Sequence, residues 1–324
     1  MSTKNNPIDL VLTALRLQLA AVKQHFIHVL ILEARRDMSA AAAITRIDSV
    51  DLPAAMYLVD HLVASGTAPK LSDDDAKLAQ GMPRVGFRDV EIKASEQALE
   101  ADLGLALTRA EESLDPSRSN ELHGWAQRSL EPRIDHAAWL SSWMGSTQPT
   151  DLPLTALSDE QALGLDCLFA SLMVVIEQGL IHSSVHWHRG ERECAQFAWE
   201  VSGAAMMQAT AMTKLLARHH LAPNPARSLE QMCHVILPEI ADDSNQAIEA
   251  DRALANRCGG LVRQCDSLLS GTRFESVLQE MATYCKAVAS WKSGGTLPQI
   301  SNPCRDLDRT RKLYVTPDRA AKSA

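Results

Sequence analysis

The sequence predicts an all-α protein composed of two tandem four-helix bundles. Strong helix formers dominate it, whereas aromatic residues make up only 4%. Long periodic segments are separated by proline and glycine, which end helices. Three short segments of the first half also recur in the second half, in the same order. The length of 324 residues is itself typical of two domains.

Eight helices are expected, and proline, glycine and capping residues mark their limits. Asn6-Pro7 is typical of a helix start, and Ser65-Gly66 of a helix end. Ser158 with Gln161 matches a capping box, which predicts a new helix after a polar linker. The expected helices cover residues 8–36, 40–64, 89–114, 120–144, 158–188, 191–220, 242–270 and 273–293.

The linker and the repeats define the expected domains. The first bundle is assigned to residues 1–147, the linker to 148–157, the more diverged second bundle to 158–294, and an extended tail to 295–324. The recurring segments are 24–28 with 178–182, 62–69 with 216–223, and 98–102 with 247–251. Nearly constant spacing between the copies indicates a tandem duplication.

Charge and cysteine content exclude several classes of protein. The net charge of −8 argues against nucleic-acid binding, which requires a positive surface. The most apolar run, 162–176, contains Asp166, so no membrane span is expected. The first nine residues lack the apolar core of a secretory signal. Seven cysteines without a C-x-x-C spacing favour reduced thiols in the cytoplasm over disulfides or a zinc site.

Residues 10–143 resemble bacterioferritin, and residues 160–292 do so more weakly. The segments that carry the resemblance are 17–28, 46–51, 60–62, 68–69, 85–86, 98–100 and 136–140. The resemblance implies a ferritin-like bundle with a crossover between its second and third helices. It also implies iron storage and ferroxidation at a di-iron site with four glutamates and two histidines.

The ligand positions that the resemblance implies in the first half are mostly altered. They fall on Gln18, Asp51, Ala54, Glu100, Arg133 and His136. Arginine is permanently cationic, so Arg133 places a positive charge where a di-metal site needs a bridging carboxylate. We therefore expect an ionic cluster of Arg133, Asp51 and Glu100, with Gln18 and His136 completing its hydrogen bonds. The alternative is a single metal ion held by Asp51, Glu100 and His136.

The corresponding positions in the second half are altered further. They fall on Leu172, Ala205, Gln208, Glu249, Ala282 and Cys285. One carboxylate cannot hold two metal ions, so we expect a metal-free apolar interior. Glu249 is expected to face a partner or to be protonated by burial.

Two further possibilities rest on methionine and histidine. The resemblance implies haem binding through paired methionines, but the equivalent positions hold Leu52 and Met206, so haem remains only an alternative. His182, His186 and His188 are interpreted as a solvated or interface patch rather than a metal platform.

These observations predict a bacterioferritin-like protein that has lost its di-iron centre. We expect no enzymatic activity and no cofactor, but a binding or assembly role with protein partners or self-assembly, and the resemblance implies a link to iron handling. We do not expect the protein to bind a nucleic acid or a membrane. The first alternative is residual iron oxidation or iron storage in the first bundle, and the second alternative is haem binding between the two bundles.

Overall fold

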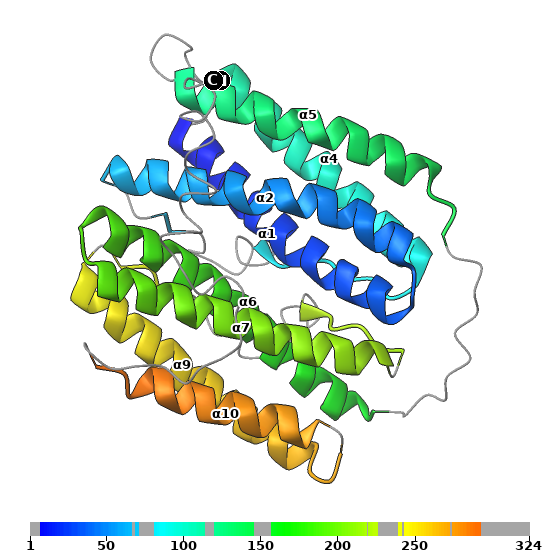
Figure 1. Cartoon of the computed structure of the whole chain (residues 1–324), viewed down its shortest axis with the longest axis vertical. Coiled ribbons are helices and arrows are strands. Elements are labelled where there is room, and N and C mark those ends of the chain that lie inside the picture. Colours follow the sequence, from blue (N-terminus) through cyan, green and yellow to red (C-terminus); the bar gives the residue numbers. More distant parts are fainter. Residues whose placement is uncertain are drawn as a thin grey trace, which may run out of the picture.

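The computed structural model describes residues 7–66, 69–70, 81–113, 120–145, 157–218, 220–225, 239–241, 243–272 and 274–292. Within these ranges the protein has eight long helices and no strand (Figure 1). The prediction of an all-α protein is therefore confirmed. The expected tail at 295–324, and all of the expected linker except residue 157, lie outside the described residues.

The helices form two groups that follow one another along the chain. The N-terminal group consists of α1 (Pro7–Ala34), α2 (Met38–Ala64), α4 (Asp89–Ser113) and α5 (Asn120–Ser142). The C-terminal group consists of α6 (Asp159–His188), α7 (Arg192–Arg218), α9 (Ser244–Leu268) and α10 (Glu275–Ala289). Helix ends differ from the expected ones by up to four residues. For example, α1 ends early because Arg36 has a positive φ of 64°.

Within each group the four helices contact one another in the same ring order, and in the C-terminal group α7 also contacts α9. In the N-terminal group α1 contacts α2 and α4, and α5 completes the ring by contacting the same two helices. In the C-terminal group α6 contacts α7 and α9, and α10 contacts those two helices. Each group encloses an interior between four helices, and the two groups lie side by side (Figure 1).

The contact between the groups is reciprocal. α1 packs against α7, and α2 packs against α6, so the first helix of each group meets the second helix of the other. A buried ion pair crosses this contact, with Lys23 Nζ 2.8 Å from Glu177 Oε2. The two groups are therefore held together by α1 and α2 on one side and by α6 and α7 on the other.

Local capping explains where several helices begin. Asp37 accepts a hydrogen bond from the Ala40 amide at 3.1 Å, which starts α2. Ser158 and Gln161 form the expected capping box, with both hydrogen bonds present. α6 is long and apolar enough to cross a membrane by length and composition, but 94% of its most apolar window is buried inside the protein. This burial is typical of the core helix of a globular protein.

Candidate functional site

A set of buried polar side chains lies in the interior of the N-terminal group. On one helix, residues three, four or seven positions apart share a face, so each helix directs its polar residues to the same place. The set comprises Gln18 and His25 on α1, Asp51 on α2, Glu96 and Glu100 on α4, and Arg133 and His136 on α5. We call these seven residues the interior cluster.

Arg133 joins two carboxylates within the interior cluster. Its Nη1 donates hydrogen bonds to both carboxylate oxygens of Glu100, at 2.8 and 2.9 Å. Its Nη2 donates to Asp51 Oδ1. Gln18 Nε2 donates to the same Asp51 oxygen at 2.5 Å. The guanidinium thus occupies the space between Asp51 and Glu100, as the sequence predicted for these three residues.

His25 was not predicted, although it is central to the interior cluster. Its ring is completely buried. Nδ1 lies 2.7 Å from Asp51 Oδ2, and Nε2 lies 2.8 Å from Glu96 Oε2. These are ion-pair contacts rather than aligned hydrogen bonds, because neither ring nitrogen has a partner of hydrogen-bond geometry among the described residues. The sequence signal was the spacing, since His25 follows Gln18 by seven residues on the same face of α1.

Glu96 was also missed, and it connects the interior cluster to two more side chains of α1. Its Oε1 accepts from Gln24 Nε2 at 3.2 Å and lies 2.5 Å from His28 Nδ1. His28 Nε2 accepts the Gly86 amide at 3.0 Å, so the proton of a neutral His28 ring is on Nδ1, facing Glu96. His136 Nε2 lies 3.5 Å from Glu96 Oε2, so its ionic partner is Glu96 rather than Asp51 or Glu100, whose hydrogen bonds it was predicted to complete.

Electrostatic contacts outweigh the effect of burial on two of these groups. Burial alone would lower the pKa of His25, but Glu96 and Asp51 raise that pKa well above its ordinary value. Burial would raise the pKa of Glu96, but His25 and His136 hold it well below the usual range. Arg133 and the protonated His25 therefore place two positive charges among the carboxylates of Asp51, Glu96 and Glu100.

The C-terminal group contains part of the same network. Gln178 Nε2 donates to Asp251 Oδ1 at 2.8 Å, and His182 Nδ1 lies 2.8 Å from the same oxygen. The amides of Glu239 and Ala241 donate to Gln178 Oε1 at 2.8 Å and to His182 Nε2 at 3.2 Å. Gln24 and His28 make the equivalent contacts in the N-terminal group. They bind Glu96 and accept hydrogen bonds from the amides of residues 84 and 86.

This correspondence corrects the predicted alignment of the third helices. Asp251 takes the place of Glu96, whereas the sequence comparison had paired it with Asp102. Glu100 therefore corresponds to Ala255, not to Glu249. The Glu249 side chain pairs with Arg252, as the first of the two predicted alternatives has it, and its 69% exposure shows that the burial expected in the second alternative is wrong.

The remaining predicted positions of the second half lie in or near the core. Leu172, Ala205, Gln208 and Cys285 are buried, and Ala282 is half-buried. In this alignment Gly179 corresponds to His25, so the central imidazole is missing from the second interior. A Cβ on Gly179 would lie 2.7 Å from the Ala198 carbonyl oxygen, because α7 packs directly against α6 at this point. Among the described residues, the second interior therefore has no counterpart of His25, and α7 leaves no room for a side chain at that position.

Three other predicted residues have different surroundings. Ala54 is buried, and its carbonyl accepts a hydrogen bond from Trp125 Nε1 at 3.2 Å. Leu52 and Met206 are partly buried against the hydrophobic core.

The histidines of α6 correct another prediction. His182 and His186 are buried rather than part of a solvated patch, whereas His188 is exposed. His186 Nδ1 lies 2.9 Å from Glu191 Oε2, close to Cys194.

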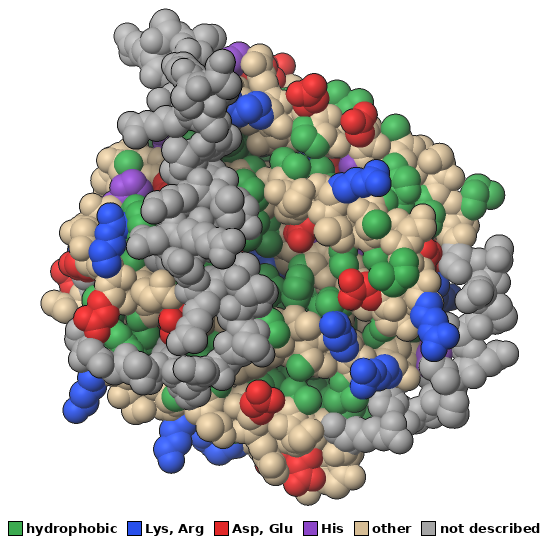
Figure 2. Space-filling view, viewed as in Figure 1, with side chains coloured by type: hydrophobic (Ala, Val, Ile, Leu, Met, Phe, Trp, Pro, Cys, Tyr) green, Lys and Arg blue, Asp and Glu red, His purple; other side chains and the backbone are tan. Residues whose placement is uncertain are grey.

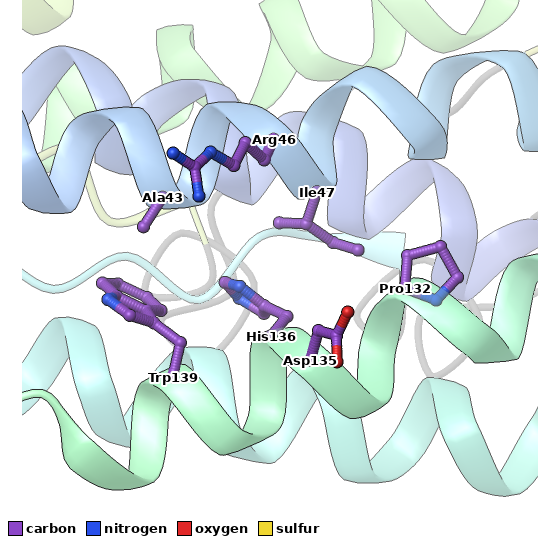
Figure 3. A pocket seen from close by; sticks show the side chains of 7 residues that line it. All are labelled: Ala43, Arg46, Ile47, Pro132, Asp135, His136 and Trp139. Carbon is purple, nitrogen blue, oxygen red and sulfur yellow. The ribbon is translucent and has the colours of Figure 1, made fainter.

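A surface pocket between α2 and α5 is lined by one residue of the interior cluster, His136 (Figure 3). Its volume is about 260 Å³. The His136 ring lies in the wall and stacks on Trp139 with ring centres 5.4 Å apart. His136 thus connects the pocket to Glu96. The lining residues are Ala43, Arg46, Ile47, Pro132, Asp135, His136 and Trp139.

No family model, curated protein or solved structure matches this chain.

The donor set does not fit a di-metal centre. Arg133 takes both oxygens of Glu100 and shares Asp51 Oδ1 with Gln18, so the two carboxylates on either side of it are already engaged. A single cation would have to take Glu100 from Arg133 and displace the added proton of His25. His25, Glu100 and His136 each offer a ligand atom within 4.8 Å of the others. This group contains His25 where the sequence had proposed Asp51.

Proposed function

We propose that this chain is a tandem pair of ferritin-like four-helix bundles without a di-iron centre, and that it acts as a non-catalytic binding or assembly component. The observation that carries the proposal is the Arg133 guanidinium between Asp51 and Glu100. A cation that cannot lose its proton replaces metal ions as the partner of these carboxylates. The interior cluster is then structural.

The repeated network supports the duplication in this proposal. Two helical groups with the same packing order use glutamine and histidine of their first helix in the same way, to bind an acid of the third helix and two amides before it. The reciprocal contact of α1 with α7 and of α2 with α6 has the form of a two-fold dimer interface. A fused dimer with one degenerate interior per half accounts for both observations.

Metal analysis of the full chain tests the proposal. Protein purified from iron-supplemented cells is expected to contain far less than one metal ion per chain, and to oxidise Fe²⁺ no faster than buffer. About two iron ions per chain, with Fe²⁺ oxidation, would contradict the loss of the di-iron centre.

Arg133→Glu tests the interior cluster itself. It should lower the free energy of unfolding by about 3–5 kcal/mol, because it removes the buried cation and adds a further carboxylate. Arg128→Glu makes the same charge change at an exposed position of α5 and should cost less than about 0.5 kcal/mol. Equal effects of the two substitutions in urea unfolding would mean that Arg133 has no special role.

A mononuclear metal site is the second candidate, because His25, Glu100 and His136 converge. Two imidazoles and a carboxylate suit Fe²⁺, Mn²⁺ or Zn²⁺. This candidate predicts about one metal ion per wild-type chain, lost in His136→Ala but retained in an Asp135→Asn control.

A further inference from the structure

The turn between α6 and α7 brings together three side chains that can bind a metal ion. They are His186 in the last turn of α6, Glu191 just before α7, and Cys194 in the first turn of α7. One ligand atom of each residue lies within 4.8 Å of the ligand atoms of the other two. His186 Nδ1 is 2.9 Å from Glu191 Oε2. We call these three residues the turn cluster.

The backbone of the turn holds the turn cluster in place. The Gly190 amide donates to the Trp187 carbonyl and the Glu191 amide to the His186 carbonyl, both at 3.0 Å. Because Gly190 has a positive φ of 79°, these two bonds form the Schellman motif that ends many helices. α7 begins directly afterwards, since the Ala195 amide donates to the Glu191 carbonyl at 2.9 Å. Hydrogen-bonded backbone on both sides of a short turn therefore fixes the three positions.

The imidazole of the turn cluster has binding capacity that the described residues do not use. The His186 side chain is completely buried. Its Nε2 has no partner of hydrogen-bond geometry among the described residues, although Nδ1 contacts Glu191. Buried polar atoms usually have a partner, so an unpaired ring nitrogen indicates that a further group binds here.

The donor atoms of the turn cluster indicate which metal it would take. Nitrogen of histidine, sulfur of cysteine and oxygen of glutamate suit Zn²⁺, whereas Mg²⁺ and Ca²⁺ prefer oxygen alone. Ligand atoms about 2.0–2.3 Å from a tetrahedral zinc ion are about 3.3–3.8 Å apart, so small side-chain movements suffice. A thiolate and a carboxylate also balance the charge of a divalent cation. In the interior cluster, by contrast, Arg133 already pairs with the carboxylates.

We propose that the turn cluster is a zinc site with three protein ligands and a water molecule as the fourth. Binding releases the proton of the Cys194 thiol to solvent, because a cysteine ligand must be deprotonated. The ion then links the end of α6 to the start of α7. The Glu191 side chain is 39% exposed, so solvent reaches the site and the ion exchanges. Chelators therefore remove the ion during purification, and added metal restores it.

Cobalt binding tests the proposal, because Co²⁺ can replace Zn²⁺ and a coordinated thiolate gives Co²⁺ a charge-transfer absorption in the near ultraviolet. The full chain is reduced, freed of metal with a chelator and titrated with Co²⁺. We expect this absorption to appear and to saturate at one Co²⁺ per chain. Added Zn²⁺ should abolish the absorption as it displaces Co²⁺.

Substitutions in the turn cluster have matched controls nearby. Cys194→Ser should abolish the absorption, and Glu191→Gln should weaken binding at least about tenfold. Glu193→Gln makes the same charge change at an exposed position two residues further on, and should bind as the wild type. Cys265→Ser removes a buried thiol that donates to the Gly164 carbonyl at 3.2 Å, and should keep the absorption.

Two results would overturn the proposal. One is a wild-type chain that gives no thiolate absorption with Co²⁺, a measurement that needs no variant to fold. The other is a Cys194→Ser variant that keeps the absorption and is folded by circular dichroism. The interior cluster contains no cysteine, so Co²⁺ bound there gives no such absorption, and His136→Ala should leave it unchanged. The zinc site and the proposed function therefore fail separately.

Discussion

Asp48 shows how a single side chain in the N-terminal interior sets a pH dependence. It lies one turn before Asp51 on α2, and its buried Oδ1 has no hydrogen-bond partner among the described residues. Burial raises its pKa, the positive His25 opposes this, and Asp51 and Glu96 add to it, giving a pKa of about 7. Glu96 shows the opposite result. Its ionic contacts with His25 and His136 outweigh burial, so its pKa is lowered.

Asp48→Asn should stabilise the protein, and more at alkaline than at acidic pH. The folded-state pKa of Asp48, about 7, lies above its ordinary value of 3.8, so the wild type loses stability as the pH rises between them. The amide cannot ionise and avoids that loss. In urea unfolding we expect the gain at pH 8 to exceed the gain at pH 5 by about 1–2 kcal/mol, after allowing for partial exposure. Asp135→Asn, at an exposed acid, should show no such difference, and a pH-independent gain for Asp48→Asn would refute the assignment.

At the scale of elements, small residues determine how closely helices approach. Gly179 brings α6 and α7 together, because a Cβ there would lie 2.7 Å from the Ala198 oxygen and 2.9 Å from the Ser202 Cβ. By contrast, a Cβ added to Gly104 on α4 would have no such neighbour within 4 Å. Helix glycines of equal propensity thus have opposite packing roles.

Gly179→Ala and Gly104→Ala should therefore change stability in opposite directions. The first forces α6 and α7 apart and should cost about 1–3 kcal/mol. The second reduces the freedom of the unfolded chain without a clash and should gain about 0.5–1 kcal/mol. Thermal or urea unfolding of both variants measures this. Stabilisation by Gly179→Ala would show that α6 and α7 pack less closely at this glycine than described.

At the scale of the whole molecule, the ion pair of Lys23 and Glu177 lies between the two groups of helices. The two residues are 154 positions apart, the same spacing that separates Gln24 from Gln178 and His28 from His182. In a dimer of identical subunits, equivalent positions near the two-fold axis carry the same residue and therefore the same charge. Under the duplication proposed above, a single chain can place opposite charges there, which favours the pairing of one half with the other.

Breaking this pair should destabilise the contact between the groups. Lys23→Met and Glu177→Leu should each cost about 3 kcal/mol, because each leaves a buried charge without this partner. The double variant should recover most of the loss, since an apolar pair can replace a buried ion pair. As a control, Asp102→Asn removes an exposed partner of Arg84 and should cost less than about 0.5 kcal/mol. Additive losses in the double variant would contradict a direct interaction.

Sequence reasoning located the helices well, because their limits depend on nearby residues. Proline, glycine and the capping box at Ser158 act within one turn. The ionic partners of Arg133 followed from charge and from positions implied by the resemblance. His25 and Glu96 were missed, although both share a helix face with a predicted residue: His25 with Gln18, and Glu96 with Glu100.

Two other predictions failed because they depended on packing partners. His182 and His186 were interpreted as part of a solvated or interface patch, but α6 is covered by α2, α7 and α9, and both side chains are buried rather than solvated. The Ala-Ile-Glu-Ala-Asp segment of α9 matched that of α4 by sequence, yet Asp251 takes the place of Glu96. A short match cannot fix which residue of a helix faces the interior.

The sequence by itself determined the helical class, the limits of most helices, and the positive charge that Arg133 brings among acidic residues. These features depend on local backbone preferences and on ionisation, which each residue carries with it. Only the tertiary structure decided that His25 and Glu96 complete the interior cluster, that Glu249 is exposed, and that His182 and His186 are buried. Those facts depend on the rotation and approach of helices that are distant in sequence, and packing of the whole chain fixes both.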